Sequence, residues 1–334
     1  MPAEWEPHTA TWLAWPHNRD TWPAQLAEVR RVWAQMVGAI AQGEQVNLLV
    51  DDRDAEAEVK AFLQAERAWS NRVVLHHIPT VDVWMRDYGP SFLSGQTGGL
   101  AFNDWMYNGW GGKYEGYEAD DGVAKEIAKL LRVPVFEPGI VLEGGSIDVN
   151  GKGVCLTTEQ CLLNPNRNPR LSKAQIEGVL EDYLTVDRVI WLGEGIEGDD
   201  TDGHIDDLAR FVNSTTVACI LGSNERDEDY RRLRENYERL AGFRDHAGKK
   251  LDVIPLPTPE PLVVDGARLP ASYANFYIAN AVVLVPAFDQ PSDDKALGIL
   301  ADLFPGRQVL GIPCAAVVYG LGAIHCVTQQ QPAP

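Results

Sequence analysis

The chain has 334 residues, of which 45% are apolar, and a formal net charge of −19 at pH 7. This composition excludes a disordered chain, and the negative charge disfavours nucleic acid and anionic membranes as partners while it favours a small cation. No apolar run approaches the roughly 18 residues of a membrane span, and the first residues lack the pattern of a secretory signal, so we expect a cytoplasmic protein.

Helical periodicity is clearest in residues 24–43, where Gly43 is expected to cap the end of the helix. The apolar positions of this stretch are Leu26, Val29, Trp33, Met36, Val37 and Ile40. Five shorter amphipathic stretches follow, at residues 54–64, 121–131, 172–184, 225–243 and 292–304. Compact apolar strands follow most of them, namely "RVVLHHI", "VPVF", "RVIWLG", "LDVIPLP" and "QVLGIP". This alternation predicts an α/β protein.

Each α/β unit is followed by one unusual polar loop. These loops are "WMRDYGP", "LEGGSID", "DDTDGHIDDLARF", "LPASYANFYIAN" and "GAIHC". A spacing of roughly 55 to 70 residues between such loops is typical of a repeated supersecondary unit. Because no linker rich in Pro, Ser or Gly divides the chain, we expect a single domain over residues 1–334.

The five cysteines are widely scattered and form neither a CxxC pair nor a cluster with histidine. The sequence therefore predicts no disulfide framework and no zinc site, and the thiols are expected to be reduced. Four of them lie in apolar, strand-like contexts and are expected in the core: Cys155, Cys161, Cys219 and Cys314. Cys326 follows a glycine-spaced apolar segment near the end of the sequence, where a buried core residue and a nucleophile are both open interpretations.

A cysteine nucleophile needs an acid or base within hydrogen-bond reach. His204 follows a glycine and precedes Asp206 by two positions, so both side chains share one side of an extended segment. A surface histidine is the alternative interpretation. His325 is adjacent to Cys326, and since neighbours on a strand point to opposite faces, His325 is not expected to be its base.

Two further acids stand in suggestive contexts. Asp87 precedes a Gly-Pro pair, which predicts a turn that fixes the aspartate at a strand end, either as a turn cap or as a functional group. Glu143 precedes a Gly-Gly pair in an apolar run, where an acid is either exposed at a strand end or orients a histidine.

Taken together, these motifs resemble the agmatine deiminase family of the guanidine-modifying, peptidylarginine-deiminase-like superfamily. The likeness runs from "MPAEWEPHTATWLAWPHNRDTWP" through "WMRDYGP", "FNDW", "WGGKY", "LEGGSID", "TDGHIDDLARF" and "PASYANFYIAN" to "GAIHCVTQQQP". It covers essentially the whole chain in order. The resemblance implies a five-bladed, pseudo-symmetric α/β propeller of the pentein type, built from repeated ββαβ units.

The resemblance also implies a role for each candidate residue. Cys326 corresponds to the nucleophile that attacks the guanidinium carbon, and His204 to the residue that protonates the leaving ammonia and later activates water. Asp87 and Asp206 correspond to the carboxylates that grip the planar guanidinium, and Glu143 to the acid that orients His204.

Two substrate contacts are expected outside this group. Trp84 is a candidate to pack on the methylene chain of the substrate, with a core tryptophan as the alternative. In the acidic run "EGDDTDGH", the distal cation of the substrate would be held by Asp199, Asp200 or Asp202, and we take Asp200 as the binding residue. A solvated loop is the alternative.

The resemblance implies hydrolysis of agmatine to N-carbamoylputrescine and ammonia in polyamine biosynthesis, without metal or organic cofactor. The acidic motif residues outnumber Arg86 and Arg210, which we expect to be structural, so agmatine is predicted over arginine. A deiminase of free or peptidyl arginine, a Cys-His amide hydrolase and a non-catalytic polyamine-binding protein remain alternatives. The sequence leaves a homo-oligomer open.

Overall fold

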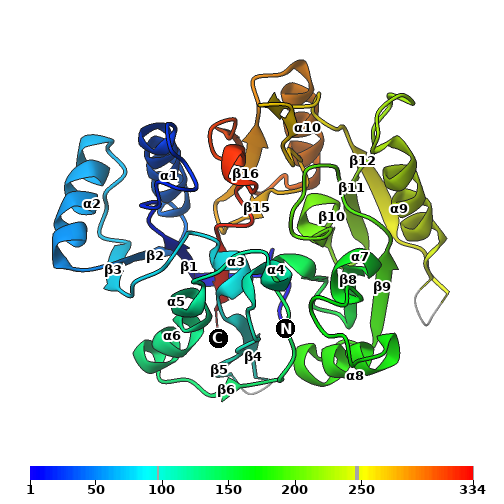
Figure 1. Cartoon of the computed structure of the whole chain (residues 1–334), viewed down its shortest axis with the longest axis horizontal. Helices are drawn as coiled ribbons and strands as arrows, with labels where there is room; N and C mark the ends of the chain where they lie inside the picture. The colour runs from blue at the N-terminus through cyan, green and yellow to red at the C-terminus, as the bar shows by residue number, and fades with distance from the viewer. Residues whose placement is uncertain (96–97, 245–247, 334) are drawn as a thin grey trace.

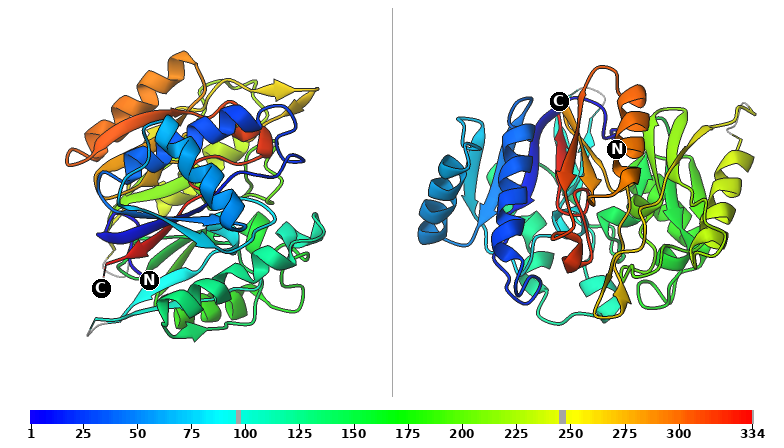
Figure 2. Two further views of the ribbon diagram at one scale, coloured as in Figure 1. Left: turned by 90° about the vertical axis from the view of Figure 1, so that its left-hand side faces the viewer. Right: turned by 90° about the horizontal axis from the view of Figure 1, so that it is seen from above.

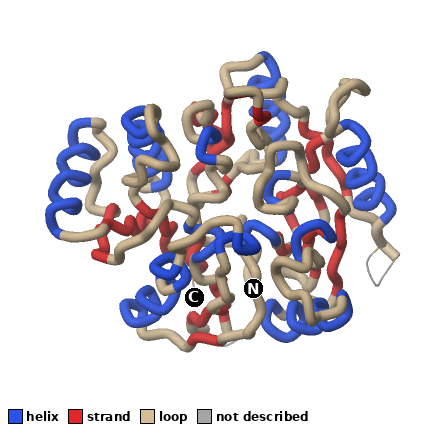
Figure 3. The backbone as a smooth tube through the Cα atoms, in the orientation of Figure 1, coloured by secondary structure: helices blue, strands red, loops and turns tan. Residues whose placement is uncertain are grey.

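The computed structural model describes residues 1–95, 98–244 and 248–333. Over these residues the chain is an α/β protein in which five sheet-and-helix units surround a common centre (Figure 1). The two outermost helices, α2 and α9, lie at opposite ends of the molecule (Figures 1 and 2). Most helices lie at the periphery, and loops fill much of the middle (Figure 3).

The elements follow in chain order. The first unit comprises β1 (His8–Ala14), α1 (Leu26–Ile40), β2 (Gln45–Val50), α2 (Arg53–Ala65) and β3 (Val73–His77). The second comprises α3 (Met85–Tyr88), β4 (Ser91–Ser94), β5 (Leu100–Asn103), α4 (Gly109–Gly112), α5 (Glu118–Asp121), α6 (Val123–Leu131) and β6 (Val135–Phe136). The third comprises the 3-10 helix η1 (Gly144–Ser146), β7 (Asp148–Val149), β8 (Val154–Thr158), α7 (Glu159–Leu162), α8 (Lys173–Leu184) and β9 (Arg188–Leu192).

The remaining units repeat this order. The fourth comprises η2 (Ile205–Asp207), β10 (Ala209–Asn213), β11 (Thr216–Ile220), α9 (Tyr230–Gly242) and β12 (Asp252–Leu256). A small hairpin of β13 (Val263–Val264) and β14 (Ala267–Arg268) follows. The fifth unit comprises β15 (Tyr277–Ile278), β16 (Val282–Ala287), α10 (Pro291–Leu303) and β17 (Gln308–Pro313), and η3 (Val318–Gly320) leads to β18 (Gln329–Pro332).

The described strands form six sheets, and one pairing scheme recurs in the five that have three or four strands. The first strand is antiparallel to the second, and the second is parallel to the third, as in β7-β8-β9 and β10-β11-β12. The parallel pair requires a crossover connection, and helices of each unit supply it. The rhythm of the sequence therefore corresponds to repeated ββαβ units, although each sheet is open and the described strands form no closed sheet.

The first sheet takes its antiparallel strand from the far end of the chain. β18 pairs with β1, and Trp12 Nε1 donates a hydrogen bond to Gln331 Oε1 at 2.9 Å. The resulting order is β18-β1-β2-β3, which brings the two ends of the described chain close together on one side of the molecule (Figures 1 and 2).

Local chemistry explains where helices begin and end. Asp52 caps α2 by accepting hydrogen bonds from the backbone N–H groups of Asp54 and Ala55. Ser172 and Gln175 form a capping box at the start of α8. The predicted helices are confirmed to within a few residues, but α1 ends at Ile40 and its cap is Ala41 instead of Gly43. None of the described helices is long and apolar enough to cross a membrane.

Candidate active site

Cys326 lies in a turn just before β18 and is 6% exposed. Its Sγ accepts a hydrogen bond from Asn275 Nδ2 at 3.1 Å and lies 3.7 Å from Asp206 Oδ2, to which the thiol can donate. Burial, reinforced by the nearby charges of Asp206, Asp207 and Asp87, raises the pKa of the thiol well above its ordinary value. The resting form is therefore a protonated thiol.

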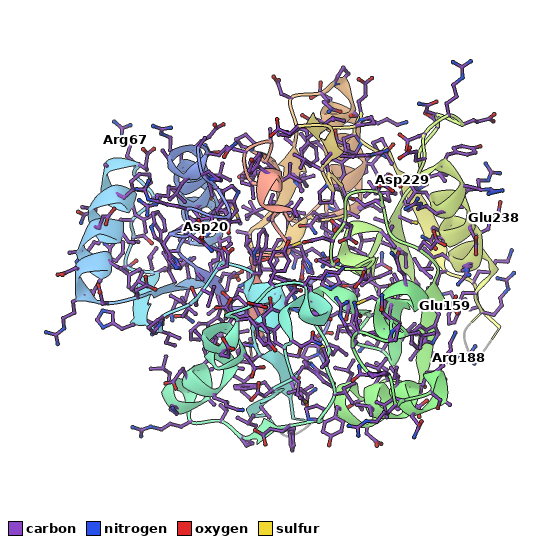
Figure 4. The ribbon with its side chains drawn as sticks, viewed as in Figure 1. Asp20, Arg67, Glu159, Arg188, Asp229 and Glu238 are labelled. Atoms are coloured by element: carbon purple, nitrogen blue, oxygen red, sulfur yellow. The ribbon has the colours of Figure 1, made fainter. Side chains whose placement is uncertain are left out.

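The thiol borders a cavity of about 470 Å³. Asp87, Trp84 and Asp200 line the same cavity, so the structure brings these predicted residues to one space with Cys326. The other lining residues are Asn18, Asp20, Thr21, Val81, Asp82, Tyr107, Trp110, Tyr114, Glu115, Tyr117, Asp120, Thr201, Tyr319, Gly320, Leu321 and Gly322. Of the residues labelled in Figure 4, Asp20 lines this cavity, whereas Arg67 and Glu238 lie at the outer edge of the view.

Asp87 lies in the short helix α3 and not at a strand end, which corrects the sequence prediction. The Gly-Pro pair still ends the element, because Gly89 closes α3 and β4 begins just after Pro90. One Asp87 carboxylate oxygen accepts from the Gly145 N–H at 3.0 Å and the other from Trp110 Nε1 at 2.9 Å. Burial and the charge of Asp206 nevertheless raise its pKa well above the ordinary value.

His204 immediately precedes η2 and is 1% exposed. Its Nδ1 lies 3.7 Å from Asp87 Oδ1, and neither ring nitrogen has a hydrogen-bond partner among the described residues. Burial lowers the pKa of His204 to about 3. The free site therefore holds a neutral imidazole with open donor and acceptor positions.

Glu143 is fully buried beside η1. One of its oxygens accepts from Arg167 Nε at 2.9 Å, and the other has no partner in the described part of the chain. One carboxylate oxygen of Glu143, one His204 ring nitrogen and Cys161 Sγ lie within 4.8 Å of one another. The structure thus brings Glu143 close to His204 without a direct hydrogen bond, and its orienting role stays a prediction.

The three side chains of Glu143, Cys161 and His204 include residue types that bind metals. Burial and the charge of Glu143 raise the pKa of Cys161 well above its ordinary value, so this thiol keeps its proton. Three ligand atoms are the most that this cluster offers among the described residues, and Arg167 already binds one oxygen of Glu143. All four cysteines assigned to the core are buried.

Asp206 lies in η2 and is completely buried. Its Oδ2 accepts from His325 Nδ1 at 2.7 Å, and its Oδ1 has no described partner. Burial alone would raise the pKa of Asp206, but the hydrogen bond and charge of His325 lower it. The prediction that His325 points away from its neighbour rested on a strand; in the observed turn, His325 and Cys326 both reach Asp206 Oδ2.

The Gly-Gly pair of "LEGGSID" allows the close approach of these groups. A Cβ on Gly144 would lie 2.1 Å from the Arg86 carbonyl oxygen, and a Cβ on Gly145 would lie 2.6 Å from His204 Nδ1 and 2.7 Å from Asp87 Oδ1. No side chain other than hydrogen fits between them. The spacing of the pair was visible in the sequence, but its steric purpose was not.

The acidic run separates into three roles. Asp199 accepts hydrogen bonds from the backbone N–H groups of Thr201 and Gly203 and so shapes the loop. Asp202 binds Arg167 and Lys113, which leaves it compensated. Asp200 accepts from the Tyr114 hydroxyl and lines the cavity. Among the three candidates for the distal cation, only Asp200 lines that cavity.

Several contacts escaped the sequence analysis. Trp110 is the first residue of "WGGKY" and binds Asp87, and Asn275 lies in "PASYANFYIAN" and binds Cys326. Nothing in a single sequence connects either residue to its partner. Arg167, which binds Glu143, had no sequence signal. Arg86 and Arg210 pair with Glu4, in agreement with the structural role expected for them.

Comparisons with known proteins place this site in a family. Residues 1–332 match the Porphyromonas-type peptidyl-arginine deiminase family. The agmatine deiminase of Stutzerimonas stutzeri is 39% identical over 358 aligned positions, which cover 100% of this chain and 95% of the relative. The chain belongs to the agmatine deiminase family.

Solved structures of this family have the same fold. The agmatine deiminase of Enterococcus faecalis, described as catalysing its reaction, superposes with a TM-score of 0.92 at 35% identity and covers 100% of this chain and 95% of its own. A cysteine-to-serine variant of the C. jejuni agmatine deiminase with substrate bound has a TM-score of 0.89 at 31% identity, with 99% and 95% covered. The chain is accordingly an α/β protein of the pentein fold.

Proposed function

We propose that the protein hydrolyses agmatine to N-carbamoylputrescine and ammonia through a covalent amidino-cysteine intermediate. The observation that carries the proposal is the cavity at Cys326, because six carboxylates and no lysine or arginine occur among the described residues that line it. These carboxylates belong to Asp20, Asp82, Asp87, Glu115, Asp120 and Asp200. Full-length similarity to agmatine deiminases supports the same reaction.

The charge of the cavity separates agmatine from arginine. Agmatine carries a cation at each end, whereas arginine carries an α-carboxylate at the end opposite the guanidinium. Burial raises the pKa of Asp82, and it raises the pKa of Asp120 to about 7, so these acids are ready to ionise beside a bound cation. Lys113 and Arg167 are already paired with Asp202, and neither lines the cavity to receive a carboxylate.

The first chemical step joins the thiol to the substrate. Asp87 and the unpaired Oδ1 of Asp206 supply the carboxylates for the guanidinium, whose positive charge lowers the pKa of Cys326. Sγ forms a bond to the guanidinium carbon, and the thiol proton passes by way of His204 to the departing nitrogen. The C–N bond breaks, ammonia leaves, and a cationic amidino-thioether remains.

The second step hydrolyses that intermediate. His204 is neutral again once ammonia has left, and its open nitrogen can accept a proton from water. The water oxygen bonds to the same carbon, and the C–S bond breaks. Of the two water protons, one returns to the sulfur and the other is released, so the ureido product is neutral at the former guanidinium. Glu143, with one free oxygen near His204, is proposed to orient the imidazole.

Two lining residues are proposed to hold the rest of the substrate. Trp84 borders the cavity and is 6% exposed, which suits a face that packs on a methylene chain. Asp200 is proposed to hold the distal ammonium from the cavity wall.

We further propose that the five sheets form one five-bladed propeller that acts as a single catalytic domain over residues 1–334. The repeated strand order and the arrangement of the units around one centre support this architecture.

The test is a competition between agmatine and arginine at neutral pH, with ammonia release and ureido products measured. We expect agmatine to be preferred by roughly a thousandfold or more in kcat/KM, since a mismatched buried charge discriminates strongly. Comparable kcat/KM values would assign the protein to arginine deimination instead. Turnover of neutral amides without either guanidine would indicate an amide hydrolase.

A further inference from the structure

The N-terminal motif reaches the active site through a chain of three buried side chains. We propose that Glu4 and His325 are positioning residues that hold Asp206 in place, so that one of its oxygens is fixed and the other is presented to the guanidinium. The inference rests on the proposed function for the identity of that guanidinium. It assigns a purpose to "MPAEWEP" and to the histidine beside the nucleophile.

The contacts form an unbroken line. His325 Nε2 lies 2.9 Å from Glu4 Oε2, and His325 Nδ1 lies 2.7 Å from Asp206 Oδ2. Asp206 Oδ2 also faces Cys326 Sγ at 3.7 Å. Each ring nitrogen of His325 thus contacts one carboxylate oxygen, and the imidazole bridges the two acids.

The charges along this line are compensated inside the protein. Glu4 also pairs with Arg86 at 3.2 Å and Arg210 at 2.9 Å, and Arg210 binds Asp148 at 3.0 Å. Burial alone would raise the pKa of Glu4, but Arg210, His325 and Arg86 hold it well below the ordinary value. With Asp206, three carboxylates thus meet two arginines and the imidazole of His325.

The arrangement leaves one atom of the line unsatisfied. Asp206 Oδ1 is buried and has no partner among the described residues, although Oδ2 is bound by His325. An unpaired buried carboxylate oxygen costs free energy unless a ligand supplies a donor. With Oδ2 fixed, the carboxylate cannot rotate away, so Oδ1 stays available to an N–H group of a guanidinium.

The surrounding space favours a positioning role. A cavity of about 10 Å³ lies against Glu4, Arg86, Asp148 and His325, which is room for about one water molecule. Substrate therefore cannot reach Glu4, and any effect of Glu4 on turnover has to be indirect.

Two substitutions of His325 separate positioning from simple packing. In His325→Asn the amide nitrogen can occupy the place of Nδ1 and keep the donor to Asp206, whereas in His325→Gln it occupies the place of Nε2 and keeps only the contact with Glu4. We expect His325→Gln to lose about a hundredfold in kcat/KM and His325→Asn to stay within about tenfold of the wild type. If His325 had a purely structural role, kcat/KM would not be lower in His325→Gln than in His325→Asn.

Glu4→Gln provides the test from the other end of the line, and Glu44→Gln is its matched control. Glu44 is also buried and pairs with a histidine, His8, at 3.0 Å, but it contacts neither His325 nor Asp206. Both changes should lower Tm. We expect only Glu4→Gln to lower kcat/KM, by about fivefold.

The rate at which Cys326 is alkylated by cationic and by neutral reagents measures how strongly the site favours a cation, without any turnover. The probes are chloroacetamidine, a cationic amidinium, and chloroacetamide, its neutral counterpart. We expect the ratio of their rates to fall about tenfold in His325→Gln, less in Glu4→Gln, and to stay at the wild-type value in Glu44→Gln.

The outcomes are distinguishable. Equal rate ratios in His325→Asn, His325→Gln and the wild type would overturn the positioning role, and if His325→Gln does not fold, an unchanged ratio in Glu4→Gln would do the same. Failure of wild-type protein to release ammonia from agmatine would refute the proposed function, while the alkylation ratios would still report on the line to Asp206.

Discussion

Two buried histidines of the site have opposite surroundings. His325 is hydrogen-bonded through both nitrogens, at 2.7 and 2.9 Å, to two carboxylates, and one of them, Glu4, also pairs with Arg86 and Arg210. His204 has no hydrogen-bond partner for either nitrogen among the described residues, and burial lowers its pKa to about 3. A histidine with fixed partners can position another group, and a histidine without them is free to move protons.

The same contrast separates the two sides of Cys326. On the inner side, Glu4 pairs with Arg86, Arg210 and His325 before any substrate arrives. On the cavity side, carboxylates lack cationic partners and their pKa values are raised, as at Asp82 and Asp87. Acids that border the cavity without cationic partners favour a cationic substrate, which would stabilise their ionised forms, and each expected outcome below tests one part of this contrast.

The largest effect is expected at Cys326, where the two sides meet. Cys326→Ser should reduce kcat to less than about one thousandth, since serine lacks the thiolate character and nucleophilicity of cysteine. Mass spectrometry of acid-quenched wild-type enzyme should show an adduct on Cys326. Cys219→Ala is the control, because this buried thiol lies in β11 and burial raises its pKa to about 12; substantial turnover in Cys326→Ser would exclude the covalent route.

The next effect compares one carboxylate from each side. Asp87→Asn and Asp206→Asn each remove a charge from the guanidinium site and should cost about 2 to 4 kcal/mol of transition-state stabilisation, measured from kcat/KM. Asp87→Asn also places an amide N–H against the donor of Gly145 or Trp110. Near-normal kcat/KM in both variants would make the carboxylates structural and contradict the assigned roles.

A smaller effect is expected at the glycine that lets the groups on both sides approach. Gly145→Ala places a methyl group against His204 and Asp87, and a displacement of about 1 Å should lower kcat roughly a hundredfold. Gly178→Ala in α8 is the control, since its Cβ would meet nothing within 4 Å; it should keep activity and gain up to about 1 kcal/mol of helix stability. Equal activity of the two variants would show that the site tolerates the methyl group.

The smallest effect is a pH dependence of stability. As pH falls below the ordinary histidine pKa of 6.5, the unfolded chain gains a proton that folded His204, with its pKa of about 3, does not take up. Wild-type protein should thus lose about 1 kcal/mol of unfolding free energy per pH unit from this residue, and His204→Asn should lack that loss. Urea unfolding of both proteins at several pH values between about 6 and 4 measures the difference; parallel curves would mean that His204 titrates normally.

Much of the fold was predictable because periodicity is a local property. The helical stretch around Trp33 and the strand "QVLGIP" appear where the apolar pattern placed them. Asp87 was misplaced on a strand because a four-residue helix such as α3 leaves too few positions for a period. The turn at His325 was missed for the same reason.

The reacting residues of the candidate site could be predicted from the sequence, but the residues that hold them in place could not. Cys326 and Asp87 share a cavity, as the motifs suggested, because each motif delivers one chemically distinctive side chain. Arg167 and Glu4 act through contacts that span distant parts of the chain, and a single sequence gives no sign of such pairs. The steric need for Gly145 likewise exists only once His204 and Asp87 are in place.

The pairing of β18 with β1 has a consequence for folding kinetics. Trp12 and Gln331 are 319 positions apart, so this contact is among the most expensive in loop-closure entropy, and Cys326 lies immediately before the strand that makes it. During refolding, the sheets with local partners can form earlier than this one. Cys326 should therefore acquire its native reactivity at the rate of the slowest step of refolding. The rate of thiol alkylation during refolding would then report when β18 pairs with β1.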